Sequence, residues 1–389
     1  MTAPLEGLRV IELARILAGP WVGQTLADLG ADVIKVEAPG GDDTRGWGPP
    51  FVERTQAGGR IDHTSAYFHS CNRGKRSVVA DFRDADDLEF VRALIATADV
   101  VVENFKLGGL VKYGLDHATL APAHPRLIYC SVTGFGQGGP RAHQAGYDFM
   151  IQGMSGIMDL TGEPDGAPQK IGVAFADIFT GLYAVIAIQA ALAAREKTGR
   201  GQHIDMALFD AMTGVLANQA QNYLATGTAP RRLGNAHPNI VPYQVFAVSD
   251  GHLIIACGND AQFARLCEVL ELPELVGEPA YRSNADRVRA RDVLVPRLAG
   301  PISGWTRDAL LAALDAAGVP AGPINTVADA FTDPQFMARG MGIAPEGMPG
   351  IRTPITFSVS SLKLDCAAPR LGQHTDALRA ELGFATRPG

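Results

Sequence analysis

The stretch KIGVAFADIFTG, residues 170–181, contains a single carboxylate, Asp177, among small and apolar residues. Burial of an unpaired charge is costly, so this residue requires either a partner or a chemical role. One interpretation is a helix N-cap, in which the carboxylate accepts a hydrogen bond from the amide of Phe179 or Thr180. The other is a nucleophile that the positive end of a helix dipole keeps ionised in an apolar cleft. The local sequence allows both.

The segment GFGQGG, residues 134–139, has the G-x-G-x-x-G spacing of dinucleotide-binding loops and follows a predicted strand. That motif also requires a helix that opens directly on the loop, whereas Pro140 and the irregular segment RAHQAGYD follow here. We therefore predict a glycine loop that lets a ligand approach the backbone, rather than a nicotinamide site.

Other chemistry-bearing residues give weaker signals. His237, in GNAHPN, and His374, in GQHTD, are not accompanied by a G-x-S-x-G nucleophile elbow, so both are expected to serve loop structure. Lys75 and Arg76, in NRGKRS, precede a predicted strand, where they fit a solvated face or the phosphates of a ligand equally well.

Composition restricts the class of protein. The 389 residues are 47% hydrophobic and 19% charged, which is typical of globular proteins with one large or two ordinary domains. A net charge of −7 without a basic tract argues against nucleic-acid binding. No signal peptide or long apolar run is found, so no transmembrane helix is expected. The five cysteines are scattered and form no CxxC pair, which indicates neither a metal site nor a disulfide framework and favours the cytoplasm.

The elements that would position these residues alternate between strands and helices in the first half of the chain. Strands are predicted within 8–13, 32–37, 76–82, 99–105 and 126–135, with helices at 19–31 and 84–98. This order predicts an α/β fold with a Rossmann-like parallel sheet covered by helices, whose ligand lies beyond the carboxyl ends of the strands. A long helix is predicted to begin at Asp177, and a strand followed by a helix at 203–224.

The pattern of predicted elements changes after the segment 226–244, which is rich in Gly and Pro. Asp250-Gly251 between two apolar runs indicates a hairpin, with helices at 260–271 and 306–318, a late strand at 351–358 and a closing helix at 371–383. The expected parts are a large domain beginning with 1–200, a linker helix region at 201–230, a small α+β domain at 231–334, and a return segment at 335–389 that completes the large domain.

Nearly the whole chain carries longer motifs: PLEGLRVIELARILAGPWVGQTLADLGADVIKVEAPGGDDTRGW, NRGKRSVVADF, VVENFKLGGLVKYGLD, YCSVTGFGQGGP, GYDFMIQGMSGIMDLTGEPDG, REKTGRGQHIDMALFDA, RLGNAHPNIVPYQVF and RTPITFS. Together these resemble the class III CoA-transferases of the CaiB/BaiF type, which include formyl-CoA transferases, dicarboxylate CoA-transferases and 2-methylacyl-CoA racemases. The resemblance implies two interlocked, ring-shaped chains in a cytoplasmic homodimer. It implies no tightly bound cofactor and no nucleic-acid or membrane partner.

The resemblance also implies a reaction in which Asp177 is the catalytic residue. Asp177 would attack the thioester of an acyl-CoA, and the departing CoA thiolate would convert the mixed anhydride into an aspartyl-CoA thioester, which an acceptor acid then displaces. The residues implied to bind CoA are Arg15, Ile16, Ala18, Asn72, Lys75, Asn104, Phe105, Lys112, Thr133, Gly134 and Phe135. Tyr147, His237 and Gly258 are expected in the substrate pocket, and Gly258 lies in CGND, a candidate lid or oxyanion donor.

Racemases of this family carry a histidine where Tyr147 stands, and tyrosine is a poor base for the proton α to a thioester. Transfer is therefore the preferred activity, ahead of racemisation and of a non-catalytic CoA-binding dimer.

Some positions differ from relatives. Some relatives carry arginine at the position of Ala38, and formyl-CoA transferases carry glutamine at Leu17 and a glycine run at 257–260, which argues against formyl-CoA and oxalate. We expect succinyl-CoA as donor and a small dicarboxylate such as itaconate, mesaconate, malate or glutarate as acceptor. Arg15, Arg45 and His237 are candidates to bind its second carboxylate.

Overall fold

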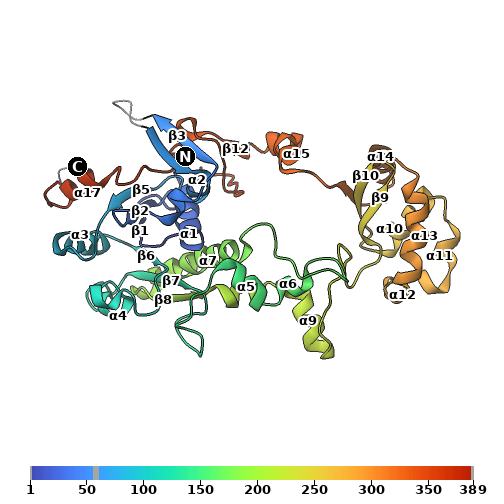
Figure 1. The fold of residues 1–389 in the computed structure, drawn as a ribbon, viewed down its shortest axis with the longest axis horizontal. Coiled ribbons are helices and arrows are strands. Elements are labelled where there is room, and N and C mark those ends of the chain that lie inside the picture. The colour runs from blue at the N-terminus through green and yellow to red at the C-terminus, as the bar shows by residue number, and fades with distance from the viewer. Residues whose placement is uncertain (1, 56–60, 387–389) are drawn as a thin grey trace. The chain divides into compact units, whose positions relative to one another are not determined.

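The computed structural model describes residues 2–55 and 61–386, which belong to two compact units (Figure 1). The first unit comprises Met1–Ile157, Lys170–Ala225 and Gln335–Gly389. The second comprises Met158–Gln169 and Thr226–Pro334. The chain therefore leaves the first unit twice and returns to it twice, so residues from both ends of the sequence build the same unit.

A six-stranded parallel sheet forms the centre of the first unit, in the order β5-β2-β1-β6-β7-β8. Its strands are β1 (Arg9–Glu12), β2 (Asp32–Glu37), β5 (Arg76–Val79), β6 (Val100–Glu103), β7 (Ile128–Thr133) and β8 (His203–Ala207). In the centre of the sheet, Val10 pairs with Val33 on one side and with Val100 on the other. Such apolar runs form parallel strands because helices cover both faces of the sheet. The α/β prediction is confirmed.

Two separate apolar clusters lie on the two faces of this sheet. Val10 belongs to the cluster that includes side chains of α1 (Ala18–Asp28), α7 (Phe175–Thr198) and α8 (Leu208–Gly214). The next residue, Ile11, belongs to the cluster that includes α3 (Ala85–Ala96) and α17 (Thr375–Glu381). This alternation follows from the two-residue repeat of a strand, which directs successive side chains to opposite faces.

Helix α7 has the length and apolar composition of a membrane-spanning helix, whereas no such helix was expected from the sequence. Its residues Ala184 and Ile188 are fully buried in the core, where the helix packs against α1. Its other side exposes Leu182 at 40%, Tyr183 at 45% and Ile186 at 61%. Core packing therefore accounts for the apolar composition of only one side of this helix.

Shorter elements complete the first unit. The helices and 3₁₀ turns are η1 (Asp43–Gly46), α2 (Ala66–Cys71), η2 (Val111–Tyr113), α4 (His117–Leu120), α5 (Asp148–Met154), α6 (Ile157–Leu160), α9 (Ala217–Thr226), α16 (Pro334–Ala338) and η4 (Pro345–Gly347), of which α6, α9 and α16 run across the boundaries between units. Two small antiparallel pairs join β3 (Phe51–Thr55) to β4 (Ile61–Ser65) and β12 (Gly342–Ile343) to β13 (Gly350–Ile351).

The second unit has its own antiparallel sheet, in the order β11-β10-β9, and its own apolar core. The strands are β9 (Tyr243–Val248), β10 (Gly251–Ala256) and β11 (Ala321–Pro323). The helices are α10 (Asp260–Val269), α11 (Glu274–Gly277), η3 (Pro279–Tyr281), α12 (Asn284–Arg289), α13 (Arg291–Ser303), α14 (Arg307–Ala316) and α15 (Val327–Thr332). The Asp250-Gly251 signal thus marks a hairpin between β9 and β10, as predicted.

Three sequence-based boundaries differ from the structure. Residues 158–169 belong to the second unit rather than to the large domain, and most of the expected linker, up to Ala225, belongs to the first unit as β8, α8 and α9. The strand predicted at 351–358 is wrong, because β13 ends at Ile351. Pro354 lacks the amide hydrogen that a ladder requires, and the Arg352 guanidinium binds the carbonyls of Thr353 and Ile355 instead.

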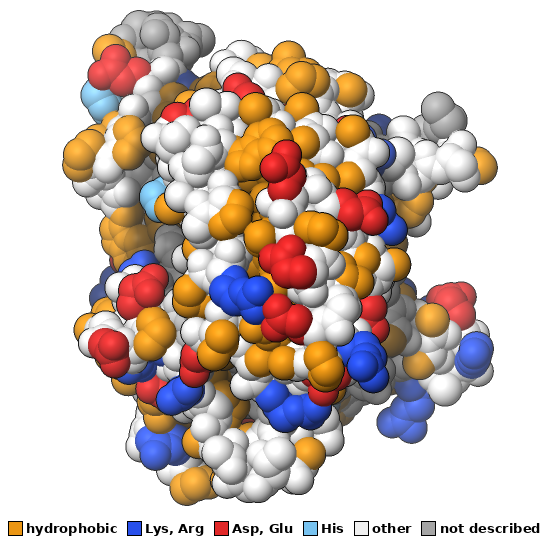
Figure 2. Space-filling model, turned by 90° about the vertical axis from the view of Figure 1, so that its right-hand side faces the viewer, with side chains coloured by type: hydrophobic (Ala, Val, Ile, Leu, Met, Phe, Trp, Pro, Cys, Tyr) orange, Lys and Arg blue, Asp and Glu red, His pale blue; other side chains and the backbone are white. Residues whose placement is uncertain are grey.

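Basic and acidic side chains are interspersed with apolar ones on the face drawn in Figure 2. The described residues of this face form no continuous basic track, in keeping with the net charge of −7.

Candidate functional site

A cleft of about 400 Å³ lies in the first unit, where the chain leaves the carboxyl ends of β1, β6 and β7. Its walls are formed by residues 15–18 after β1, 104–107 after β6, 132–134 of β7 and the following loop, and 142–148, together with Asp177. The cleft therefore lies at the edge of the sheet where a parallel α/β fold is expected to bind its ligand.

Asp177 lies in the first turn of α7, as the third residue of the helix. Of the two interpretations, the helix N-cap is wrong, because the N-cap residue is Ala174 and the helix begins at Phe175. The capping carboxylate belongs to another helix: Asp148 Oδ1 accepts hydrogen bonds from the amides of Ala176 at 2.8 Å and Asp177 at 3.4 Å. The Asp177 carboxylate is thus released from capping and lines the cleft.

Gln152 fixes Asp148 in this role. The fully buried Gln152 side chain donates from Nε2 to Asp148 Oδ2 at 2.8 Å, and its Oε1 accepts the amide of Ile171 at 2.9 Å. Asp148 and Gln152 lie one turn apart on α5, so they occupy the same side of that helix. Helix α5 therefore orients the start of α7, and with it the Asp177 side chain.

Burial and the neighbouring charge of Asp148 raise the pKa of Asp177 from its ordinary value of 3.8 to about 7. This finding corrects the expectation that the helix dipole keeps the carboxylate ionised well below neutral pH. The dipole acts on an acidic group in the first turn, but desolvation and like-charge repulsion outweigh it here. Asp177 is consequently a destabilised carboxylate whose charge changes near neutral pH.

Tyr67 lies near Asp177 and Trp47 lies beside Tyr67, and neither residue was predicted to belong to the site. Burial, and after it the charge of Asp177, raises the pKa of Tyr67, which places the phenol within electrostatic reach of that carboxylate. The rings of Tyr67 and Trp47 meet edge to face at 5.4 Å. Trp47 ends the motif EAPGGDDTRGW, a loop beyond the carboxyl end of β2, and that position was the available signal for it.

The cleft brings together seven of the residues predicted to bind CoA: Arg15, Ile16, Ala18, Asn104, Phe105, Thr133 and Gly134. Tyr147 also lines it and is 63% exposed. Two hydrogen bonds join two segments of the wall, since Asn104 Oδ1 accepts the amide of Arg15 at 2.9 Å and Asn104 Nδ2 donates to the Arg15 carbonyl at 2.7 Å. Asn104 thus shapes the cleft through the backbone of Arg15.

Lys75 and Asn72, also predicted to bind CoA, do not line this cleft with their side chains. The Lys75 ammonium is fully buried and lies 2.8 Å from Glu12 Oε2, 2.8 Å from Asn72 Oδ1 and 2.9 Å from the Pro20 carbonyl. Gly23 of α1 makes room for this arrangement, because a Cβ there would lie 1.8 Å from Glu12 Oε2. The phosphate-binding role expected for the Lys75 ammonium does not fit this enclosed position.

Three further predicted side chains lie elsewhere in the first unit. Lys112 is exposed, with its ammonium 4.7 Å from the centre of the Tyr113 ring. Phe135 packs against the core beside Phe209. The Arg45 guanidinium, considered for a substrate carboxylate, is instead paired with Glu37 through contacts of 2.8 and 2.7 Å.

His237 and Gly258 belong to the second unit, and their predicted place in the substrate pocket stays a prediction. His237 Nδ1 accepts the amide of Asn239 at 3.1 Å, and its own amide donates to the Tyr243 carbonyl at 2.9 Å. The Gly258 amide donates to Gln262 Oε1 at 2.7 Å. His374, in the first unit, accepts the Ser77 amide at Nδ1, which confirms its expected role in loop structure.

The glycine loop follows β7 and is not succeeded by a helix until α5 begins at Asp148. This confirms that the segment is not a dinucleotide-binding turn. Gly134 and Gly146 face one another in the cleft wall, and a Cβ on Gly134 would lie 2.5 Å from the Gly146 Cα. Glycine is therefore required at these two positions, where the backbone at 134 closely approaches the backbone at 146.

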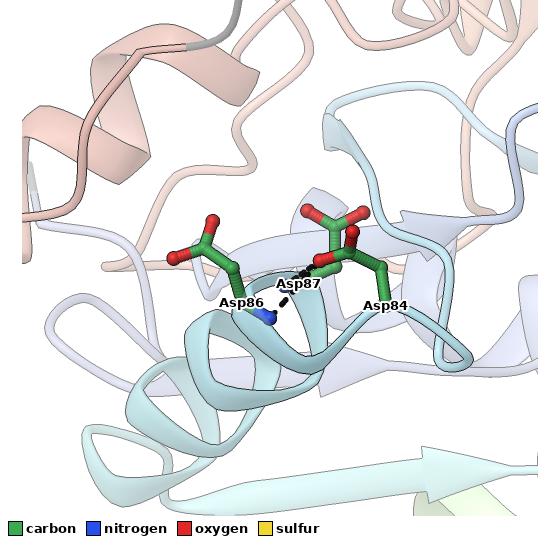
Figure 3. A group of neighbouring side chains, drawn as sticks. All are labelled: Asp84, Asp86 and Asp87. Atoms are coloured by element: carbon green, nitrogen blue, oxygen red, sulfur yellow. Dashed lines mark hydrogen bonds between the residues drawn. The ribbon is translucent and has the colours of Figure 1, made fainter.

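One group of three acidic side chains, Asp84, Asp86 and Asp87, lies close enough together to suggest a metal site among residues 2–55 and 61–386 (Figure 3). The Asp84 carboxylate caps α3 by accepting the amides of Asp86 and Asp87, each at 3.0 Å. The buried Arg379 guanidinium forms ion pairs with Asp86 and Asp87. A helix cap and an ion pair account for this cluster.

The cleft thus presents the partly buried Asp177 carboxylate, whose pKa is raised, next to Asp148, together with glycine residues in its wall and the basic side chains of Arg15 and Lys106. A carboxylate held in this way is a suitable nucleophile for an activated acyl group, because desolvation raises its reactivity once it is ionised.

Comparison with known proteins agrees with this chemistry. Residues 5–375 match CoA-transferase family III. The chain is 54% identical over 385 residues to succinate–glutarate CoA-transferase of Agrobacterium fabrum, covering 97% of this chain and 96% of that protein. It is 41% identical over 387 residues to succinyl-CoA:glutarate CoA-transferase of Mus musculus, covering 97% and 86%. A crystal structure of a CaiB/BaiF family protein from Brucella suis is 65% identical, with a TM-score of 0.88 and coverage of 98% and 100%. The chain therefore belongs to CoA-transferase family III, as the sequence motifs predicted.

Proposed function

We propose that this protein transfers CoA from succinyl-CoA to a small dicarboxylic acid, of which glutarate is the leading candidate, through a covalent intermediate on Asp177. The observation that carries this proposal is the partly buried Asp177 carboxylate in a cleft lined by seven of the residues expected to bind CoA. The names of the two relatives described above, which act on succinate or succinyl-CoA and on glutarate, support the choice of substrates.

The proposed reaction begins when an Asp177 oxygen attacks the thioester carbonyl carbon, which breaks the C–S bond and expels CoA as thiolate. The thiolate then attacks the Asp177 carbonyl of the mixed anhydride, which releases the donor acid as a carboxylate and leaves an aspartyl-CoA thioester. The acceptor carboxylate attacks this thioester and the thiolate leaves again. Attack of the thiolate on the acceptor's acyl carbonyl forms the new acyl-CoA and regenerates Asp177, so no redox step is required.

Basic side chains at the cleft support binding of an anionic substrate. Arg15 and Lys106 line the cleft, and the Arg15 guanidinium is half exposed while it contacts Asp43 at 3.1 Å. An exposed ion pair of this kind contributes little stability, so exchange of Asp43 for a substrate carboxylate is inexpensive. We assign Arg15 to the second carboxylate of the acid or to a CoA phosphate.

We further propose that the protein is a homodimer, with the ring-shaped chains interlocked as in its family. Support comes from large apolar side chains exposed on three helices of the first unit: Phe149 and Met150 of α5, Leu182, Tyr183 and Ile186 of α7, and Tyr223 and Leu224 of α9. Apolar side chains in such number mark a protein interface more often than a free surface. Analytical ultracentrifugation is expected to give twice the chain mass of 41.1 kDa.

The activity test supplies succinyl-CoA together with glutarate, mesaconate, itaconate or malate and measures each new acyl-CoA by chromatography with mass detection. We expect transfer to at least one dicarboxylate and no transfer to monocarboxylates of equal length. The matched control is Asp177→Ala, which removes the nucleophile but leaves the Asp148 cap of α7 in place. Absence of any new acyl-CoA, or equal rates for wild type and Asp177→Ala, would contradict the proposed function.

A further inference from the structure

The turn that follows β1 contains an unusual backbone conformation. Ile16 has φ of 72°, in the left-handed region that β-branched residues rarely adopt. Ile16 lies in the cleft wall, between Arg15 and the start of α1 at Ala18. Strained conformations of this kind persist only where the surrounding structure holds them, and they concentrate at functional sites.

Side chains from several elements hold the backbone of this turn. The buried Lys35 ammonium donates to the Ala14 carbonyl at 2.8 Å, and Asn104 binds both backbone groups of Arg15. The Ile16 amide lies 3.3 Å from each carboxylate oxygen of Asp42, and the Ile16 carbonyl lies 3.6 Å from Cys71 Sγ. The turn thus relies on side chains rather than on a regular ladder for its backbone hydrogen bonds.

The Asp42 side chain is itself held in place by the Lys35 ammonium. Its Oδ2 lies 2.9 Å from Lys35 Nζ, and both side chains are fully buried. Burial acts to raise the pKa of Asp42, but the Lys35 ammonium outweighs it and holds this pKa below the usual range. The acceptor that faces the Ile16 amide is therefore an anion, which makes the hydrogen bond stronger than one to a neutral group.

A purely structural role explains only part of this geometry. Asp42 is also the N-cap of η1, where Oδ1 accepts the Thr44 amide at 3.0 Å and the Thr44 hydroxyl at 2.8 Å. A capping carboxylate requires only those contacts. It does not require a second segment of chain, distant in sequence, to present a strained amide to the same carboxylate.

We propose that Asp42, anchored by Lys35, is a positioning residue that holds Ile16 in its left-handed conformation and so keeps the wall of the acyl-CoA cleft in its binding form. This inference rests on the proposed function for the identity of the ligand, CoA. Without the carboxylate, the turn relaxes to an ordinary conformation and only a fraction of the molecules retain the binding form.

The test is a double-mutant cycle that measures the affinity for free CoA by calorimetry. Asp42→Ala is expected to weaken binding roughly 5- to 150-fold, the range set by the cost of one strained residue. Ile16→Gly removes the Cβ that makes the left-handed region costly, together with a side chain that lines the cleft, so its own affinity for CoA is measured first and is the reference for the double variant. In the double variant, affinity should return to within about threefold of Ile16→Gly, because glycine no longer needs the carboxylate.

The matched control is Asp84→Ala, which removes another helix-capping aspartate of the first unit, one that binds the amides of Asp86 and Asp87 and not those of the turn. It should leave CoA affinity unchanged and show no coupling to Ile16→Gly. If Asp42→Ala does not fold, Asp42→Asn retains one acceptor oxygen and should show a smaller loss that Ile16→Gly again restores.

Wild-type affinity in Asp42→Ala, or losses from Asp42→Ala that Ile16→Gly fails to restore, would overturn the proposal. A crystal structure of Asp42→Ala in which Ile16 retains a positive φ would overturn it as well. Because the readout is binding of CoA, a wild-type protein that binds CoA without turnover would contradict the proposed function and leave this test intact.

Discussion

Replacing Asp177, the proposed nucleophile, by asparagine should raise the unfolding free energy of the protein, and only at pH values above the mildly acidic range. The pKa of Asp177 is displaced from 3.8 in an ordinary environment to about 7 in the folded protein. Each pKa unit corresponds to about 1.4 kcal/mol, so the ionised carboxylate costs the folded state up to about 4 kcal/mol. Because Asp177 is only partly buried, we expect a smaller effect of about 2–4 kcal/mol for Asp177→Asn at alkaline pH.

The sign follows from proton linkage. Below the unfolded pKa of 3.8, both states of the wild type bind the proton, and the variant and the wild type should have similar stability. Between that value and about 7, the folded state retains a proton that the unfolded chain has released, so the unfolding free energy of the wild type falls as pH rises. Above about 7 the full cost is present, and the advantage of Asp177→Asn reaches its maximum.

The assay is thermal and denaturant unfolding of wild type and Asp177→Asn at matched protein concentration, at about pH 4.5 and about pH 8.5. The control is Asp376→Asn, in the first turn of α17, whose side chain is exposed. We expect the difference between variant and wild type to grow with pH for Asp177 only. A pH-independent difference, or destabilisation at about pH 8.5, would refute the argument that burial and Asp148 raise the pKa of Asp177.

Three other outcomes are expected. The value of kcat/KM for acyl-CoA should rise with pH through about 7 as Asp177 ionises. Asp148→Asn removes a charge but retains an oxygen for the α7 amides, so it should move this rise to lower pH. A pH profile that does not move in Asp148→Asn would contradict the role of Asp148. Lys75→Met should lower the unfolding free energy by about 1–3 kcal/mol, because it removes one of the two buried ammonium groups that pair with Glu12 and leaves only Lys35. Lys112→Met should change it by less than about 0.5 kcal/mol in the same denaturant titration; equal losses would show that Lys75 is not enclosed. In deuterated water without an acceptor acid, the wild type should not exchange the α-proton of a 2-methylacyl-CoA. Tyr147→Phe should reduce the rate of CoA transfer only modestly, because Tyr147 is 63% exposed. Rapid exchange in the wild type that Tyr147→Phe abolishes would favour a racemase.

The sheet of the first unit was predicted well from the sequence, because the apolar pattern that indicates each strand lies within that strand. Apolar runs such as Val100–Val102 must be buried on both faces, and helical segments between such runs leave few alternatives to a parallel sheet. The position of the cleft followed from the same logic, because loops after parallel strands meet at one edge. The catalytic role of Asp177 came from the resemblance to the family, because the local sequence allowed both a helix cap and a nucleophile.

The errors concern partners that lie far apart in the sequence. Nothing near Asp177 indicates that Asp148, 29 residues earlier, caps α7, or that its charge raises a pKa. Likewise, a lysine before a strand is usually solvated, and only the fold reveals that Glu12, 63 residues away, encloses Lys75. Side-chain pairing across elements is decided by tertiary packing, so motif and periodicity alone could not distinguish a buried cation from a phosphate ligand.

The central claim is that Asp177 becomes covalently acylated, and trapping tests it most directly. The protein is incubated with succinyl-CoA, quenched with hydroxylamine and digested, and the peptide that contains Asp177 is analysed by mass spectrometry. Both the anhydride and the aspartyl-CoA thioester are activated acyl groups, so hydroxylamine should convert Asp177 into a hydroxamate only when acyl-CoA is present. Succinyl-CoA-dependent hydroxamate at Asp177, absent with free CoA alone, is the predicted result. An unmodified Asp177 peptide from protein that is actively transferring CoA would contradict the account.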